Sequence, residues 1–170
     1  SAHFTICPFV RSRLSPLQLE RMVPDSPIFL DSDDLKDMRT LIEFVRQSSV
    51  LVLVQSQHVL ERPWCLLEIY TAIEAGIPIV AVNVQGKGYS FDDSSAFLTH
   101  LDTLLDRVNP GASKLIEQEA GVSTDVVAHA CCEVLPSVIS VAFNSFGSRN
   151  AIQASLLDLL HGIISAKSRP

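Results

Sequence analysis

The chain has 170 residues, of which 47% are hydrophobic and 19% are charged, as expected for one globular domain with a sizeable core rather than a disordered chain. The formal net charge is −6, and lysine and arginine are scattered along the chain, which argues against nucleic acid as a partner. The longest apolar runs, Val50–Val54 and Ile77–Val84, are too short to cross a bilayer, so no membrane partner is expected.

Apolar strand-like segments alternate with segments whose apolar residues recur at helical spacing. Glycine, serine and aspartate are frequent in Gly86–Ser95, which predicts a surface loop there. In chain order, we predict a strand at Phe4–Val10, a helix at Leu14–Val23, a strand at Pro27–Leu30, a helix at Asp37–Gln47, a strand at Ser49–Val54, a helix at Trp64–Ala75, a strand at Ile77–Val84, helices at Phe97–Val108 and Ser123–Val134, a strand at Val138–Phe143 and a helix at Arg149–Ile164.

This alternation predicts a parallel sheet with helices on both faces, in the α/β class. Five strands in about 150 residues suit a flavodoxin-like three-layer sandwich, with one domain over residues 1–170 and a core of about 4–164. Ligands of such sheets bind outside the carboxyl ends of the strands. The segments to examine are therefore Val10–Arg13, Asp31–Lys36, Ser56–Trp64 and Gln85–Ser90.

The four cysteines fit neither a zinc-binding pattern nor an evident disulfide pair, because Cys131 and Cys132 are adjacent while Cys7 and Cys65 stand alone. We expect reduced thiols, which indicates a cytoplasmic protein. The first residues contain no basic segment followed by an apolar stretch, so no signal peptide is predicted.

Trp64 and Glu68 are four residues apart in a predicted helix and therefore share one side of it. We expect that side to differ from the stripe that packs on the sheet, so that the aromatic ring and the carboxylate face the strand ends. Pro63 suits the first helical position. The alternative is structural: Trp64 is a core anchor and Glu68 a surface carboxylate favoured by the helix dipole. The packing stripe is predicted to be Leu66, Ile69, Tyr70 and Ile73.

Four stretches of the chain resemble the TIR (Toll/interleukin-1 receptor) domain family. The resemblance is strong over Pro27–Val84 and elsewhere concerns only the order of elements. Its most specific part is the box Pro63-Trp64-Cys65-Leu66-Leu67-Glu68. The four stretches are Ile28–Asp31, Val50–Val54 with Ser56, Arg62–Ile69 and Ile77–Val82.

The resemblance implies that the domain cleaves NAD⁺ as an NAD⁺ glycohydrolase and that Glu68, at the position of the family's catalytic glutamate, is the catalytic residue. It also implies activation by self-association with other TIR domains, in immune or cell-death signalling. NAD⁺ would be the substrate, and no cofactor or metal is expected. The residues expected to bind substrate are Trp64, Phe9, Arg11, Arg13, Asp31, Ser32 and Ser56.

The chain departs from the family pattern in the loops around this site. Val59 and Arg62 stand where the family often has tyrosine and serine, and the loop after Leu30 lacks the usual glycine. Phe4–Val10 also matches the family's first strand poorly. These departures concern substrate contacts and assembly geometry rather than the fold.

Other functions remain open at this point. The chief rival is a TIR domain that acts only as a homotypic interaction module, and another is a flavodoxin-like domain that binds a different nucleotide or phosphate. The acidic run Asp31–Asp34 suggests a phosphoacceptor or Mg²⁺ site, but no lysine follows Phe143 as such a site requires. His58 has no nucleophile elbow near it, which argues against a hydrolase triad, and His100 is expected to be a partly exposed helix residue.

Overall fold

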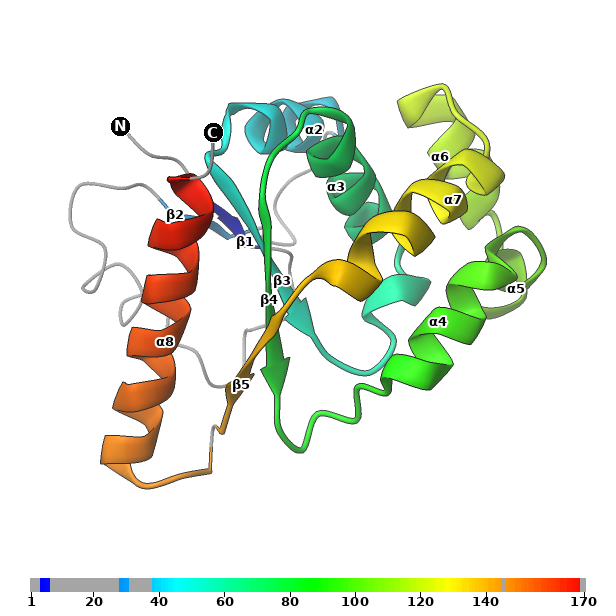
Figure 1. The fold of residues 1–170 in the computed structure, drawn as a ribbon. Helices are drawn as coiled ribbons and strands as arrows, with labels where there is room; N and C mark the ends of the chain where they lie inside the picture. The colour runs from blue at the N-terminus through cyan, green and yellow to red at the C-terminus, as the bar shows by residue number, and fades with distance from the viewer. Residues whose placement is uncertain (1–3, 7–27, 31–37, 145, 169–170) are drawn as a thin grey trace.

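The computed structural model describes residues 4–6, 28–30, 38–144 and 146–168 (Figure 1). The predicted helix at Leu14–Val23 lies outside these residues. The strands are β1 (Phe4–Ile6), β2 (Ile28–Leu30), β3 (Val50–Gln55), β4 (Ile79–Val84) and β5 (Ser140–Phe143). The helices are α2 (Met38–Gln47), α3 (Pro63–Glu74), α4 (Phe91–Thr99), α5 (Leu101–Val108), α6 (Ala112–Ala120), α7 (Thr124–Val134) and α8 (Arg149–Lys167), with 3₁₀ turns η1 (Val59–Glu61) and η2 (Leu135–Ser137).

The strands form one sheet in the order β2-β1-β3-β4-β5, and every neighbouring pair is parallel. The predicted α/β class, with a parallel sheet and helices, is confirmed. β3 lies at the centre of the sheet and all six of its residues are buried, which explains its continuous apolar sequence. Among the five strands, the side chains are described for β3, β4 and β5.

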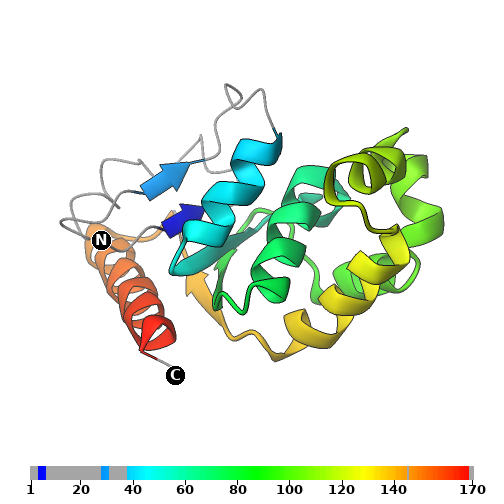
Figure 2. The same ribbon diagram turned by 90° about the horizontal axis from the view of Figure 1, so that it is seen from above.

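Alternate side chains of β3 enter two separate clusters of buried residues on opposite faces of the sheet. Leu51 and Leu53 belong to the cluster formed with α2 to α7, which we call the α3-side core. Val50, Val52 and Val54 belong to the cluster formed with α8, which we call the α8-side core. Figures 1 and 2 show α8 on one side of the sheet and the other helices across from it.

The ends of the helices carry recognisable signals. Pro63 begins α3, where its missing N–H breaks no helical hydrogen bond. Gly76 follows the end of α3 with φ 65°, a conformation that glycine adopts without a Cβ penalty. The hydroxyls of Ser90 and Ser148 accept hydrogen bonds from the first turns of α4 and α8. No helix among the described residues is long and apolar enough to cross a membrane.

The segment between β4 and β5 differs from the prediction. The helix predicted at Phe97–Val108 is two helices, α4 and α5, and His100 is an exposed junction residue between them rather than a helix residue. The cap at Ser90 starts α4 within the predicted loop Gly86–Ser95. Periodicity alone missed both boundaries, because Leu98, Leu101 and Leu105 all pack into the α3-side core despite the break.

Helix α6 was not predicted. It follows α5 closely, and the Ser113 N–H near its start donates a 3.0 Å hydrogen bond to Oδ1 of Asp106 in α5. This bond, with weaker help from the Gly111 and Ala112 N–H groups, holds the pKa of Asp106 below its ordinary value. Ile116 then packs α6 into the α3-side core. The side-chain cap thus compensates for the short, weakly apolar sequence of α6.

Candidate functional site

The loops at the carboxyl ends of β3, β4 and β5 are tied to one another by backbone hydrogen bonds. The Gln57 N–H after β3 donates to the Lys87 carbonyl after β4 at 2.9 Å. The Gln85 N–H donates to the carbonyl of Phe143, the last residue of β5, at 2.8 Å. These bonds fix the positions from which side chains project at this edge of the sheet, which we call the strand-end edge.

Helix α3 begins at the strand-end edge and runs back over the sheet between its neighbours α2 and α7 (Figure 1). Eight of its twelve residues are buried, Glu68 among them with 0% exposure. An α-helix rises 1.5 Å per residue, so Glu68 lies about 7.5 Å along the axis from Pro63. A carboxylate is therefore held inside the protein, below the start of α3.

The expectation that Trp64 and Glu68 lie on a side of α3 free of packing is corrected. Trp64 is half-buried and packs against the α3-side core, as do Tyr70 and Ile73 of the predicted stripe. The helix is covered on several sides because α2, α6 and α7 also contact it. Burial, principally, raises the pKa of Tyr70, and the Glu74 carboxylate adds to the effect, so Tyr70 is a neutral phenol at pH 7.

The other predicted site residues are divided between described and undescribed parts of the chain. Ser56 is buried at the end of β3, at the strand-end edge. β1 and β2 run parallel to β3, so their last residues, Ile6 and Leu30, lie towards this same edge. The predicted substrate contacts Phe9, Arg11, Arg13, Asp31 and Ser32 lie outside the described residues.

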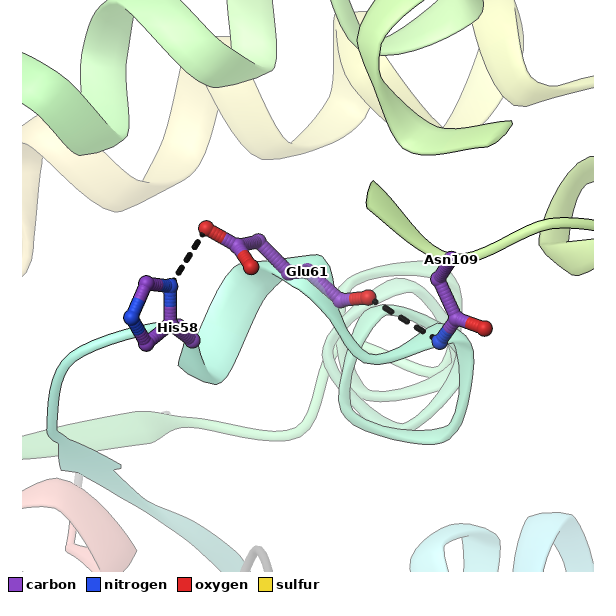
Figure 3. Close-up of polar contacts among 3 residues, drawn as sticks. All are labelled: His58, Glu61 and Asn109. Carbon is purple, nitrogen blue, oxygen red and sulfur yellow. Dashed lines mark hydrogen bonds and ion pairs between the residues drawn. The ribbon is translucent and has the colours of Figure 1, made fainter. Parts of the chain in front are cut away.

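Between β3 and α3, a polar cluster holds the turn η1 in place (Figure 3). His58 has a left-handed backbone (φ 63°), and its Nδ1 lies 2.7 Å from Oε1 of Glu61. A carboxylate can only accept, so Nδ1 of His58 carries the proton. Nδ2 of Asn109, which follows α5, donates to the Glu61 carbonyl at 3.4 Å. The cluster links the start of α3 to the turn after α5, and His58 acts in it as an anchor.

Gln55 is a candidate site residue that the sequence pattern did not single out. It is the last residue of β3, only 5% of it is exposed, and its Oε1 is buried without a hydrogen-bond partner. Oγ of Ser56 is in the same state. The available signal was a polar residue closing an otherwise apolar strand at the edge where parallel sheets bind ligands.

Metal binding finds no support in the part of the chain that the structure describes. There, no group of three or more histidine, cysteine, aspartate or glutamate side chains is arranged to hold a metal ion. Cys65, Cys131 and Cys132 are free thiols. What the described site offers chemically is a buried carboxylate, a half-buried indole and two buried polar side chains.

Comparison of the chain with protein-family models gave no match, and comparison with curated proteins gave none of significance.

Proposed function

We propose that this chain is a TIR domain that cleaves the nicotinamide–ribose bond of NAD⁺ and is activated by self-association. The observation that carries the proposal is the complete burial of Glu68 within the Trp-Cys-Leu-Leu-Glu box. Burying a carboxylate costs free energy that an apolar residue of similar size would not cost. Glutamate is among the residues least often fully buried, so Glu68 is a candidate for function.

The arrangement of the fold supports the same proposal. The strand order β2-β1-β3-β4-β5, with buried clusters on both faces, supports a flavodoxin-like three-layer sandwich of five strands. α3, which carries the box, begins directly after the central strand and its 3₁₀ turn. The box and the strand-end edge are therefore neighbours, as a ligand site of such a fold requires.

One carboxylate suffices for the proposed reaction. The bond between ribose C1′ and the pyridinium nitrogen breaks with both electrons going to nitrogen, so nicotinamide leaves neutral and needs no general acid. The ribosyl group left behind has oxocarbenium character, which the negative charge of Glu68 stabilises in a site removed from water. Water then adds to C1′ and loses a proton, giving ADP-ribose and nicotinamide. Trp64 would border the nicotinamide side of the site.

We propose the cytoplasm as the location, where NAD⁺ is abundant and thiols stay reduced. Cys65, Cys131 and Cys132 as free thiols support this. The signalling role in immunity or cell death rests on the family resemblance.

The deciding experiment is the Glu68→Gln substitution, which removes the charge and keeps the shape. We expect NAD⁺ cleavage, measured by separating nicotinamide and ADP-ribose chromatographically, to fall about 10²–10³-fold, the usual loss when a transition-state charge loses its partner. Glu74→Gln is the matched control, because Glu74 lies in the same helix and is exposed. It should keep full activity.

The readout must separate catalysis from folding and from assembly. The circular dichroism spectrum and the melting transition of Glu68→Gln should be those of a folded protein. Its self-association, followed by light scattering, should equal that of the wild type. If wild-type protein leaves NAD⁺ intact at every concentration while still associating, the domain is an interaction module instead.

A further inference from the structure

Two adjacent side chains at the end of β3 have buried polar atoms without hydrogen-bond partners. They are Oε1 of Gln55 and Oγ of Ser56, in residues that are each only 5% exposed. Buried polar atoms are nearly always hydrogen-bonded, and leaving one unsatisfied destabilises the folded state. A bound ligand that supplies the missing partners would explain why the fold keeps both.

The backbone at the end of β3, which carries Gln55, is held by its neighbours. Gln55 is in register with Asn83 of β4, and Gln57 is hydrogen-bonded to Lys87 across the strand-end edge. Gln55 follows Leu53 by two residues, so it faces the side of the sheet that α3 covers, the side on which Glu68 is buried. Oγ of Ser140 in β5 is also without a hydrogen-bond partner.

The chemistry of the Gln55 side chain indicates what it binds. Its Oε1 needs an N–H or O–H donor, and its amide N–H can donate to a carbonyl. A primary carboxamide offers both on one carbon, and the amide of Gln55 can pair with it through two hydrogen bonds. In NAD⁺ the nicotinamide ring, at the bond to be broken, carries such a group.

We infer that Gln55 binds the carboxamide of the nicotinamide ring and so selects the substrate; this inference rests on the proposed function. The interaction is made with the substrate as well as in the transition state. Losing it should therefore raise KM and leave kcat nearly unchanged. Glu68→Gln, in contrast, should lower kcat.

The test compares NAD⁺ with 3-acetylpyridine adenine dinucleotide, in which a methyl group replaces the amide nitrogen. Wild-type protein should prefer NAD⁺ in kcat/KM by about tenfold, the factor expected for one hydrogen bond. In Gln55→Leu, kcat/KM for NAD⁺ should fall about tenfold and that for the analogue should change less than twofold, so the preference disappears. Ser113→Ala, the matched control, should leave kcat/KM unchanged for both substrates.

Stability gives a second readout. Gln55→Leu removes an unsatisfied buried oxygen, so the melting temperature without ligand should rise, by about 2–4 °C for a chain of this size. If Gln55 served only the fold, Gln55→Leu would instead lower both the melting temperature and the activity. If Gln55→Leu lowers kcat/KM equally for both substrates, the inference is wrong while the proposed function stands.

If the wild type cleaves no NAD⁺, the proposed function fails and nicotinamide binding decides the inference. Saturation-transfer NMR should then show nicotinamide bound to the wild type and absent from Gln55→Leu. No binding to the wild type, or equal binding to both proteins, would overturn it.

Discussion

At the scale of single residues, the neighbours Cys131 and Cys132 in α7 have different surroundings. Successive residues of a helix point about 100° apart, so one thiol turns into the α3-side core while the other lies at its margin. Cys131 is 0% exposed, and burial, with a smaller effect from Cys132, raises its pKa to about 12. Because the thiolate is the reactive form, Cys131 should be chemically inert in the folded protein.

We predict that iodoacetamide at pH 8 alkylates Cys132 in the native protein and leaves Cys131 unmodified, as read by peptide mass spectrometry. In urea both should react, which is the control. The raised pKa also stabilises the fold below the unfolded thiol pKa of about 9. That contribution should disappear as the pH rises from about 9 towards 12, because only the unfolded thiol ionises there. Equal labelling of the two cysteines in native protein would contradict the burial.

The residue pattern could predict which side chains of α3 lie near one another, but not how many sides of the helix are covered. A spacing of four places Trp64 and Glu68 together, and both do lie in the buried part of the structure or at its margin. That α2 and α7 flank α3 depends on contacts between segments far apart in the chain. Gln55 was not predicted as a site residue for a similar reason, since its unsatisfied oxygen can be identified only when all its neighbours are known.

At the scale of elements, Gly162 of α8 lies where the helix faces the sheet. A Cβ placed on Gly162 would lie 3.5 Å from Cγ1 of Val80 and 3.8 Å from Cγ2 of Val141, both ordinary van der Waals distances. Gly162 lies inside α8 and has no positive φ, so it costs about 0.8–1 kcal/mol of helix propensity relative to alanine. The site has room for one methyl group and for little more.

We predict that Gly162→Ala raises the free energy of unfolding by about 0.5–1 kcal/mol, measured by urea denaturation. Gly162→Leu, with three more carbons directed at Val80 and Val141, should lower it by about 1–3 kcal/mol. The pair is its own control, because both substitutions gain helix propensity and differ only in volume. Stabilisation by leucine would show that α8 can move away from the sheet.

Strand and helix types were largely predictable from the sequence, and helix boundaries less so. β3 and β4 lie within a residue or two of their predicted positions, since continuous β-branched runs have few alternatives. α4 and α5 were merged because the leucines on both sides of His100 keep one period across the break. Serine and aspartate capping, at Ser90 and Asp106, decided where α4 and α6 begin.

At the scale of the whole molecule, the two cores share a single sheet. Ile116 of α6 is buried in the α3-side core, and Ile163 of α8 is buried in the α8-side core, on the opposite face. β3 and β4 supply residues to both faces, so unfolding of these strands would expose both cores. The chain should therefore unfold as one cooperative unit, as the single domain proposed for residues 1–170 requires.

Conservative truncation on each face tests this. Ile116→Val and Ile163→Val should each lower the free energy of unfolding by about 0.5–1.5 kcal/mol, the usual cost of one buried methyl group. The two residues do not share a cluster, so the double variant should show the sum within about 0.5 kcal/mol. Trp64, the chain's one tryptophan, reports the α3-side core by fluorescence, and far-ultraviolet circular dichroism reports all helices.

Both probes should give the same urea midpoint in the wild type and in each variant, because one transition removes both cores. A separate unit formed by α4 to α7 would behave differently. Ile116→Val would then move the fluorescence midpoint and only part of the dichroism change, and Ile163→Val would move the rest of the dichroism change and leave the fluorescence midpoint unchanged. Coincident shifts would also bear on the site. Glu68 in the α3-side core and Gln55 at the end of β3 would then be held by the same cooperative structure. A substitution that destabilises either core would therefore destabilise the surroundings of both residues.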